Sequence, residues 1–290
     1  MIAVNLHIRP AVAEDQQQIA DLIRFESHVH RHLDWRTPLE WLGDSPFLVH
    51  EQDGRLSAVL ACPSDPESIA WIRLFAFDST LSGPYAWARL WEAARQELAQ
   101  RGRVTVACIA MQRWLEPILI NSGFVLYQHI VMLDWDGPLF TPCPMPQGVT
   151  LRPMTAGDLP AVAEVDASGF ESLWQNSLAA LTRALSQALY ASVAMDGARL
   201  VGYQLSTANP HGAHLARLAI RPEAQRRGLA SALVSDLILH QKEHGGRSFI
   251  TVNTQAGNTA SLALYHKIGF RRTGEQYPVY RLDVDEAEPA

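Results

Sequence analysis

Apolar and polar positions in the second half of the chain follow two periods in turn, one typical of strands and one of helices. Leu229, Leu233, Leu237 and Ile238 recur at the spacing of one helix face, and short β-branched or apolar runs lie between such stretches. The expected strands are 191–195, 200–207, 214–220, 248–254 and 279–284 with another at Leu151, and the expected helices are 157–167, 227–244 and 259–267. Strands alternating with helices predict an α/β (α+β) fold, with a mixed sheet flanked by helices.

The chain also repeats itself, because four short landmarks occur twice in the same order. They are Ile8-Arg9-Pro10 and Leu151-Arg152-Pro153, Asp53-Gly54 and Asp196-Gly197, Arg73-Leu74 and Arg217-Leu218, and Gly123-Phe124 and Gly269-Phe270. The paired residues lie 143, 143, 144 and 146 positions apart, which indicates two copies of one fold. We expect domains at 1–137 and 148–290, joined by a proline-rich extended linker at 138–147.

Composition narrows the class of protein. A chain of 290 residues suits two domains, and 48% hydrophobic with 19% charged residues argues against extended disorder. The net charge of -6 gives no broad basic surface, so we expect no nucleic-acid partner. No stretch is long and apolar enough to span a bilayer, and three scattered cysteines indicate a reducing compartment. These observations predict a cytoplasmic protein with no membrane partner.

An anion-binding turn is predicted between the strand 214–220 and the helix that follows it. Pro222 ends the strand, and Gly228 leads the chain into the helix. Backbone N–H groups at a helix N-terminus lack partners and lie at the positive end of the helix dipole, so they suit a pyrophosphate. Gly228 lets the backbone approach phosphate closely, and Arg226 and Arg227 add positive charge. The plainer interpretation is an ordinary turn with exposed arginines.

A second segment, 258–270, predicts a short helix and the start of the next strand. Asn258 suits the N-cap, and Gly269 suits a left-handed C-cap before Phe270. Taken alone, Asn258 would be only a cap and Tyr265 only a core aromatic.

Together the two segments resemble the GNAT superfamily of N-acetyltransferases. Gln225, Gly228 and Ala230 match that family's phosphate loop, Gln/Arg-x-x-Gly-x-Gly/Ala, and the later helix matches its asparagine followed by Tyr-x-x-x-Gly-Phe. The resemblance covers about residues 148–284. It implies tandem domains, each with a splayed sheet in which two parallel strands part to admit pantetheine. The cofactor-binding residues that it implies are Leu218, Ala219, Ile220, Gln225, Arg226, Arg227, Gly228, Leu229, Ala230, Ser231, Asn258 and Tyr265.

The resemblance further implies an acetyl-CoA-dependent N-acetyltransferase, an acyltransferase that releases CoA as product. A neutral primary amine, on a small molecule or a protein N-terminus, would attack the acyl carbonyl directly while backbone donors hold the oxyanion. Tyr265 would be the general acid for the departing thiolate. The partners are then acetyl-CoA and an amine acceptor; no metal is expected, and a homodimer stays open. The alternative from another class is a non-catalytic acyl-CoA-binding sensor.

The sequence defines the acceptor site and the general base less sharply. Glu171 and Trp174 lie where this fold usually shapes the acceptor cleft, and Thr251 and Asn253 lie on an expected strand. These four are the candidate substrate residues, although an exposed helix face is an equal interpretation of the first two. By placement, the candidate bases are His214, Glu171, Asp166 and Thr251. A lone histidine or carboxylate is more often structural than catalytic.

The first copy departs from the family pattern. Residues 78–87 contain neither the phosphate loop nor an arginine, and Leu119 stands where the second copy has Tyr265. We therefore expect a degenerate, non-catalytic first domain that serves as a wall of the acceptor site or as a scaffold. His28, His30 and His32 alternate without metal-ligand spacing and predict a solvated loop.

Overall fold

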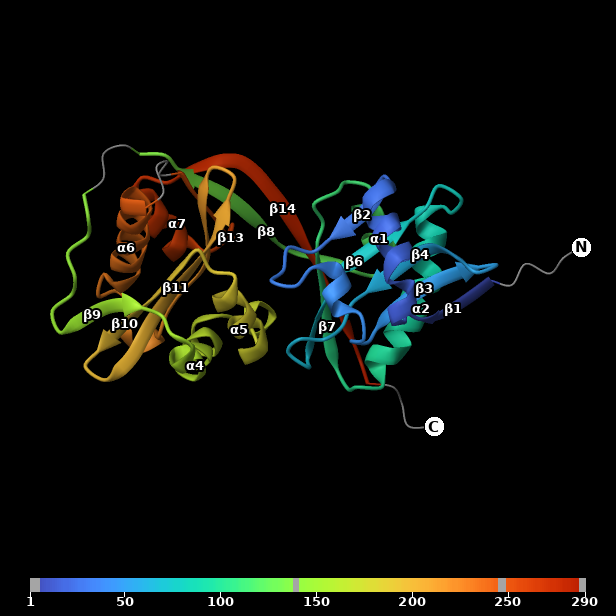
Figure 1. Cartoon of the computed structure of the whole chain (residues 1–290), viewed down its shortest axis with the longest axis horizontal. Helices are drawn as coiled ribbons and strands as arrows, with labels where there is room; N and C mark the ends of the chain where they lie inside the picture. The colour runs from blue at the N-terminus through green and yellow to red at the C-terminus, as the bar shows by residue number, and fades with distance from the viewer. Residues whose placement is uncertain (1–5, 138–140, 245–248, 287–290) are drawn as a thin grey trace, which may run out of the picture. The chain divides into compact units, whose positions relative to one another are not determined.

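A computed structural model describes residues 6–137, 141–244 and 249–286 of the chain. The chain divides into two compact units, each of which combines strands and helices (Figure 1). Unit 1 comprises Met1–Tyr127 together with Pro278–Ala290, and unit 2 comprises Gln128–Tyr277. The predicted α/β (α+β) class is confirmed for both units.

Unit 1 is built on an antiparallel sheet in the order β1-β3-β4-β6-β2, and its strands β5 and β7 pair separately, in parallel. Its strands are β1 (Leu6–Pro10), β2 (His28–Arg31), β3 (Phe47–Gln52), β4 (Arg55–Ala61), β5 (Ile69–Trp71), β6 (Leu74–Phe77) and β7 (Val104–Ile109), and its helices are α1 (Gln16–Phe25), α2 (Gly83–Ala99) and α3 (Leu115–Asn121). Helix α2 buries Trp87, Leu90 and Leu98 in the core of this unit.

Unit 2 contains a mixed sheet in the order β8-β13-β12-β11-β10-β9. Its elements are β8 (Val125–Trp135), β9 (Val149–Pro153), α4 (Leu159–Gly169), α5 (Leu178–Ser186), β10 (Tyr190–Asp196), β11 (Arg199–Asn209), β12 (Gly212–Ile220), α6 (Leu229–His244), β13 (Phe249–Gln255), α7 (Thr259–Ile268) and β14 (Arg271–Val284). Helices α6 and α7 cover one face, and α4 and α5 cover the other (Figure 1). The expected strands and helices are present, with residue 248 outside the described residues. The strand expected after Phe270 and the strand expected at 279–284 are one strand, β14, and α5 is an additional helix.

A β-bulge in β12 decides which side chains reach each face of this sheet. Leu215 lies opposite Ser206 and Arg217 lies opposite Leu205, so Ala216 is an extra residue between them. Leu215 packs against α6 before the bulge, and Ile220 packs against α6 after it. The extra residue therefore turns Arg217 to the opposite face, where α4 lies.

The last strand of each copy completes the other unit. In unit 2, β13 pairs with β8, and Trp135 of β8 is buried in the core with Val234 of α6. In unit 1, β7 pairs with the end of β14, and Tyr280 of β14 is buried in the core with Trp87. This arrangement corrects the predicted domains 1–137 and 148–290, because strand pairing links residues that are far apart in sequence.

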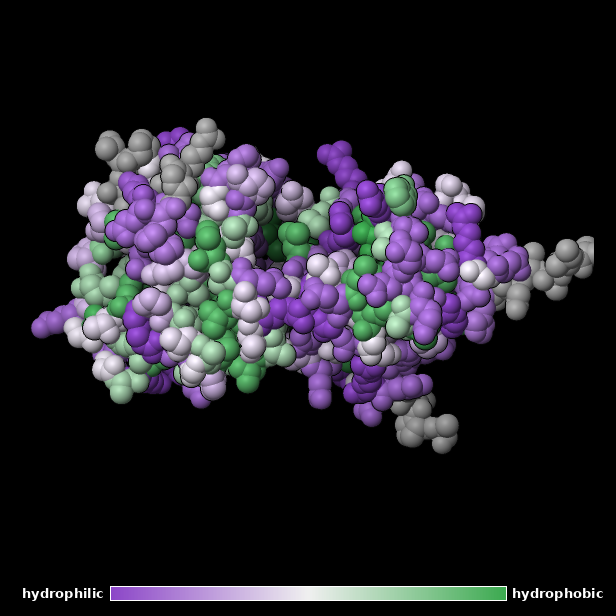
Figure 2. All heavy atoms as spheres, viewed as in Figure 1, coloured by the Kyte–Doolittle hydropathy of each residue, from purple (hydrophilic) through white to green (hydrophobic). Residues whose placement is uncertain are grey.

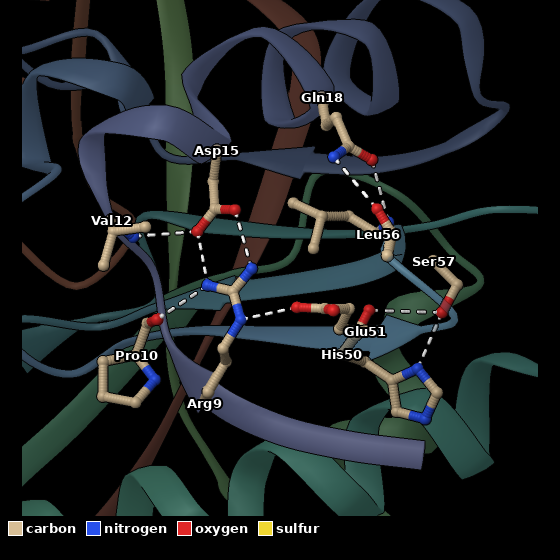
Figure 3. Close-up of polar contacts among 10 residues, drawn as sticks. Arg9, Pro10, Val12, Asp15, Gln18, His50, Glu51, Leu56 and Ser57 are labelled. Carbon is tan, nitrogen blue, oxygen red and sulfur yellow. Dashed lines mark hydrogen bonds and ion pairs between the residues drawn. The ribbon is translucent and has the colours of Figure 1, made fainter. Parts of the chain in front are cut away.

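The internal repeat is visible in side-chain contacts as well as in sequence. Arg9 Nη1 lies 2.6 Å from Asp15 Oδ2 (Figure 3), and Arg152 Nη2 lies 2.6 Å from Asp158 Oδ1. In both copies the backbone N–H three residues before the aspartate also donates to it, at 2.8 Å. Each pair ties the first strand of its copy to the start of the first helix. Two copies of one local design therefore support the interpretation of a duplicated fold.

The visible surface of each unit mixes apolar and polar side chains over short distances (Figure 2). Such mixing is ordinary for protein surfaces. None of the helices in the described ranges combines the length and the apolar character needed to cross a bilayer.

Candidate active site

The parallel strands β12 and β13 part in the middle of unit 2. They pair from Gly212 and Phe249 to Leu215 and Val252, and the register ends there. Strand β12 nevertheless continues to Ile220, held on its other edge by β11. The inner edges of the two strands are thus unpaired beyond Leu215 within the described sheet. This is the splayed sheet that the family resemblance implies.

A pocket lies in the splay and has an empty volume of about 540 Å³, including the part open to solvent. It is lined by Ile130, Phe170, Trp174, Leu215, Ala216, Arg217, Leu218, Val252, Asn253, Thr254, Gln255, Asn258, Ser261 and Tyr265. Five of the residues singled out from the sequence are brought together here: Leu218, Trp174, Asn253, Asn258 and Tyr265.

Tyr265 lies on α7, at the wall of the pocket. Its side chain is 4% exposed and packs against Phe270, with ring centroids 5.4 Å apart. Burial raises the pKa of the Tyr265 phenol above its usual range. No group in the described part of the chain hydrogen-bonds its hydroxyl. The phenol is therefore protonated at neutral pH and able to donate its proton.

Asn258 has two structural roles, because it caps helix α7 and also lines the pocket. Its Oδ1 accepts a hydrogen bond of 3.0 Å from the Ser261 backbone N–H at the start of α7. The helix ends at Gly269, whose φ of +105° is the left-handed conformation expected of the C-cap. The cap interpretation and the pocket interpretation of Asn258 are compatible.

The anion-binding turn precedes α6 as expected. Gly228 has φ +89° and Arg226 has φ +61°, and both are exposed. Helix α6 begins at Leu229, two residues later than predicted, because Gly228 is in the left-handed region. The first hydrogen bond along the helix runs from Ala232 N to Gly228 O at 3.0 Å. The backbone N–H groups of Leu229, Ala230 and Ser231 precede this bond, at the positive end of the helix.

Two side chains of the turn contact the rest of unit 2. Gln225 Nε2 donates to the Ile220 carbonyl at 3.2 Å, and Arg227 Nη1 lies 2.6 Å from Asp196 Oδ2. Ala219 and Ile220 are buried and do not line the pocket. The turn is thus anchored to the end of β12 and to the β10–β11 hairpin.

The remaining acceptor and base candidates fall in different places. Glu171 is exposed before the 3₁₀ turn η4 (Ser172–Trp174) and does not line the pocket. Thr251 also lies outside the lining, where its hydroxyl is 2.9 Å from His214 Nδ1. His214 Nε2 in turn lies 3.1 Å from Asn253 Oδ1, so Nε2 is the protonated nitrogen. Burial lowers the pKa of His214, which keeps the ring neutral at neutral pH.

Asp166 is a structural ion-pair residue rather than a base facing the pocket. It is fully buried on α4, and its Oδ2 accepts from Arg217 Nε at 3.1 Å and from the Tyr203 hydroxyl. Its Oδ1 accepts from Asn176 N at 2.8 Å. With both oxygens occupied, Asp166 has a structural explanation for its burial.

Arg217 is the main residue that sequence reasoning did not assign to the site. The signal was present, since a charged side chain in an apolar strand must find a partner or lie at a site. Phe170 is not among the candidates drawn from the sequence, and Ile130 of β8 falls within the predicted first domain, 1–137. Thr254, Gln255 and Ser261 also line the pocket and carry no distinguishing sequence signal.

In unit 1 the parallel strands also part, but strand β2 occupies the space between them. The parallel pairing of β5 and β7 ends at Trp71 and Ala107, the repeat counterparts of Leu215 and Val252. Beyond that point β2 pairs with β6, from Arg31–Leu74 to His28–Phe77. The counterpart of β2 in unit 2 is the segment of η4, which adds no strand.

This strand corrects the prediction that the histidine-rich segment is a solvated loop. His30 is fully buried, and its Nε2 lies 3.0 Å from the Ile72 carbonyl. Alternation of side chains along a strand explains the alternating histidines. Within the described residues, no group of His, Cys, Asp or Glu could hold a metal ion.

Comparisons with known proteins agree with this geometry. The family model of the GNAT acetyltransferase domain matches residues 159–280. The N-alpha-acetyltransferase RimI of Mycobacterium tuberculosis is 31% identical over 146 residues, which are 48% of this chain and 89% of that protein. An uncharacterised N-acetyltransferase of Methanocaldococcus jannaschii is 24% identical over 137 residues, 47% of this chain and 86% of that protein.

A solved structure extends the likeness in fold to both units. A tandem GNAT protein from the clavulanic acid biosynthesis pathway has a TM-score of 0.66 at 15% identity, covering 98% of this chain and 100% of that one. The splayed sheet, the turn before α6, and the sequence relatives point the same way. The chain therefore belongs to the GNAT family and is an acyltransferase.

Proposed function

We propose that unit 2 transfers an acetyl group from acetyl-CoA to a primary amine, on a small molecule or a protein N-terminus, by direct attack. The observation that carries the proposal is the parting of β12 and β13, which opens a pocket between Leu218 and Tyr265 in the same unit as the turn before α6. The chain thus offers an anion-binding helix end and a pocket with a buried proton donor.

The residues of the turn fit a pyrophosphate. The backbone N–H groups of Leu229, Ala230 and Ser231 lie at the start of α6, where the helix dipole adds positive potential. Gly228 presents no side chain to the phosphates, and Arg226 is exposed beside it. Arg227 forms an ion pair with Asp196, so we expect it to contribute less to phosphate binding than Arg226 does. Acetyl-CoA, when bound, supplies the thioester carbonyl that the amine attacks.

Within the pocket, Tyr265 is the proposed general acid. Its raised pKa keeps the hydroxyl protonated, so a proton is available to a thiolate that forms near it. Backbone N–H groups on the unpaired inner edge of β12 are the proposed donors to the developing oxyanion, as Ala216 and Leu218 both line the pocket. Asn258 is the proposed contact to cofactor or acceptor.

Unit 1 is proposed to be non-catalytic. Strand β2 pairs with β6 where the splay of unit 2 stays open, and His30 of β2 contacts both the Ile72 carbonyl and Cys108 of β7. Leu119 replaces the proposed acid, and residues 78–87 contain no phosphate loop. One site per chain is therefore expected.

The test is calorimetry with acetyl-CoA on the full chain, followed by a CoA-release assay against a panel of primary amines. Binding at one site per chain with amine-dependent CoA release supports the transferase. Failure to bind acetyl-CoA would refute it, and tight binding without turnover on any amine would favour a sensor.

A further inference from the structure

The pocket of unit 2 has two sides, and one of them carries an unexpected charge. Asn258, Ser261 and Tyr265 come from the segment of α7, on the face that α6 covers. Phe170, Trp174 and Arg217 lie on the opposite face, toward α4. Since the proposed cofactor site begins at α6, the α4 side is the side left to the acceptor.

Arg217 is the charged residue among those that line the pocket, and the lining contains no Asp or Glu. The only carboxylate that contacts Arg217 in the described structure is Asp166, which is buried behind it. The ion pair is neutral as a whole, but its guanidinium lies on the pocket side. The acceptor side therefore presents guanidinium N–H donors and no carboxylate.

The contacts of Arg217 leave one nitrogen available. Its Nε and Nη2 donate to Asp166, and Nη2 also donates to the Trp174 carbonyl at 2.8 Å. The guanidinium lies 3.8 Å from the centroid of the Phe170 ring. The Tyr203 hydroxyl also interacts with the guanidinium. Nη1 takes no part in the hydrogen bonds to Asp166 and Trp174. An arginine held so firmly presents the remaining N–H groups in a fixed direction.

Asn253 adds a second donor on the same side. Its Oδ1 is engaged by His214, which leaves its Nδ2 without a hydrogen bond in the described residues. A cationic acceptor group finds no carboxylate here, and the Phe170 ring face is already covered by Arg217. A carboxylate, in contrast, would accept charge-assisted hydrogen bonds from both donors.

We propose that the acceptor is a small amino carboxylate, such as a free amino acid, whose carboxylate binds Arg217 Nη1 and Asn253 Nδ2. This inference rests on the proposed acetyl transfer and narrows its acceptor from amines in general to amines with a neighbouring carboxylate. Phe170 and Trp174 line the same side and favour an acceptor with an apolar or aromatic side chain.

The chain contains its own control for Arg217. Arg73 is the repeat counterpart, paired with Asp34 at 2.8 Å and lying over the Trp41 ring. Its backbone carbonyl accepts from His32 N at 3.0 Å, at the end of the segment that fills the splay of unit 1. The two arginines occupy equivalent positions in the repeat, and each forms an ion pair with an aspartate. Arg73, however, does not line the unit 2 pocket.

The experiment compares matched acceptors that differ only in the carboxylate, phenylalanine with phenethylamine and tyrosine with tyramine. CoA release from acetyl-CoA is measured with the full chain. We expect kcat/KM to favour the amino acid of each pair by about tenfold or more, the effect of a hydrogen bond to a charged group. Arg217→Lys and Asn253→Ala should each reduce this preference, while Arg73→Lys should leave it unchanged.

The outcomes separate this inference from the proposed function. Acetyl-CoA binding with equal or better turnover of the decarboxylated amines would overturn the carboxylate site and leave the transferase standing. No acetyl-CoA binding would overturn both. The wild-type comparison needs no substitution, so it decides the matter even if Arg217→Lys does not fold.

Discussion

Leu215 and Val252 are the last residues that face each other across the parallel strands β12 and β13. Beyond this pair the inner edge of β12 is free of strand partners in the described sheet, and the pocket begins. In unit 1 the counterpart pair is Trp71 and Ala107, and β2 occupies the space beyond it. One structural difference, an added strand, thus separates the unit with a pocket in its splay from the unit without one.

Calorimetry should therefore find one acetyl-CoA per chain. The open splay and the turn before α6 occur together in unit 2, whereas unit 1 has neither. A second site of similar affinity would contradict the filled splay of unit 1.

Gly228→Val should weaken acetyl-CoA binding by about tenfold or more. At φ +89° a β-branched residue is strained, and its side chain would lie where phosphate is expected. Gly274→Val is the matched control, because Gly274, near the start of β14, has φ +90° and open space around it. Both variants should lose a similar amount of stability, measured by thermal unfolding. Equal losses of affinity in the two variants would count against the phosphate site.

Tyr265→Phe should lower kcat by about 10²-fold and leave acetyl-CoA affinity nearly unchanged. The substitution removes the hydroxyl and keeps the ring that packs on Phe270. Because burial raises the pKa of Tyr265, wild-type kcat should show no alkaline loss from this group below about pH 10. Tyr280→Phe in unit 1, whose hydroxyl donates to Glu116, should leave kcat unchanged. Wild-type turnover in Tyr265→Phe would remove Tyr265 from the chemistry.

Asp158→Asn should destabilise unit 2 by about 1 kcal/mol at neutral pH. The Arg152 hydrogen bonds, together with the Thr155 N–H and hydroxyl, hold the pKa of Asp158 below its usual range. A carboxylate with a lowered folded-state pKa adds stability above its unfolded pKa of about 3.9, and that stability is lost as pH falls through the folded value. Urea unfolding should therefore show a difference between wild type and variant at pH 7 that shrinks below about pH 4. A difference that does not change with pH would contradict this assignment.

The fragment 128–277 should fold and bind acetyl-CoA, while the fragment 148–290 should not. The first contains β8, which pairs with β13 and brings Trp135 into the core. The second lacks this strand and carries instead the end of β14, which pairs with β7 of unit 1. Circular dichroism and calorimetry on both fragments test whether unit 2 needs β8 to fold. A well-folded fragment 148–290 would contradict this requirement.

The sequence was sufficient for the features that depend on local pattern. Hydrophobic period predicted the strands and helices of unit 2, and the motif around Gly228 predicted the turn before α6. Two other features depend on partners far away in sequence. Arg217 contacts Asp166, 51 positions away, and β8 pairs with β13 although most of unit 2 lies between them in sequence. Strand β2 is only four residues long and rich in histidine, so no local pattern favours it.

The exchange of β8 and β14 between the two copies also affects folding during synthesis of the chain. Ile109 of β7 finds its partner Val279 only after all of unit 2 has been made. At ribosomal speed, the outer edge of β7 stays bare for on the order of ten seconds. A nascent chain with such an edge is prone to pair with its neighbours, so successful synthesis depends on keeping this edge covered until the C-terminal residues arrive.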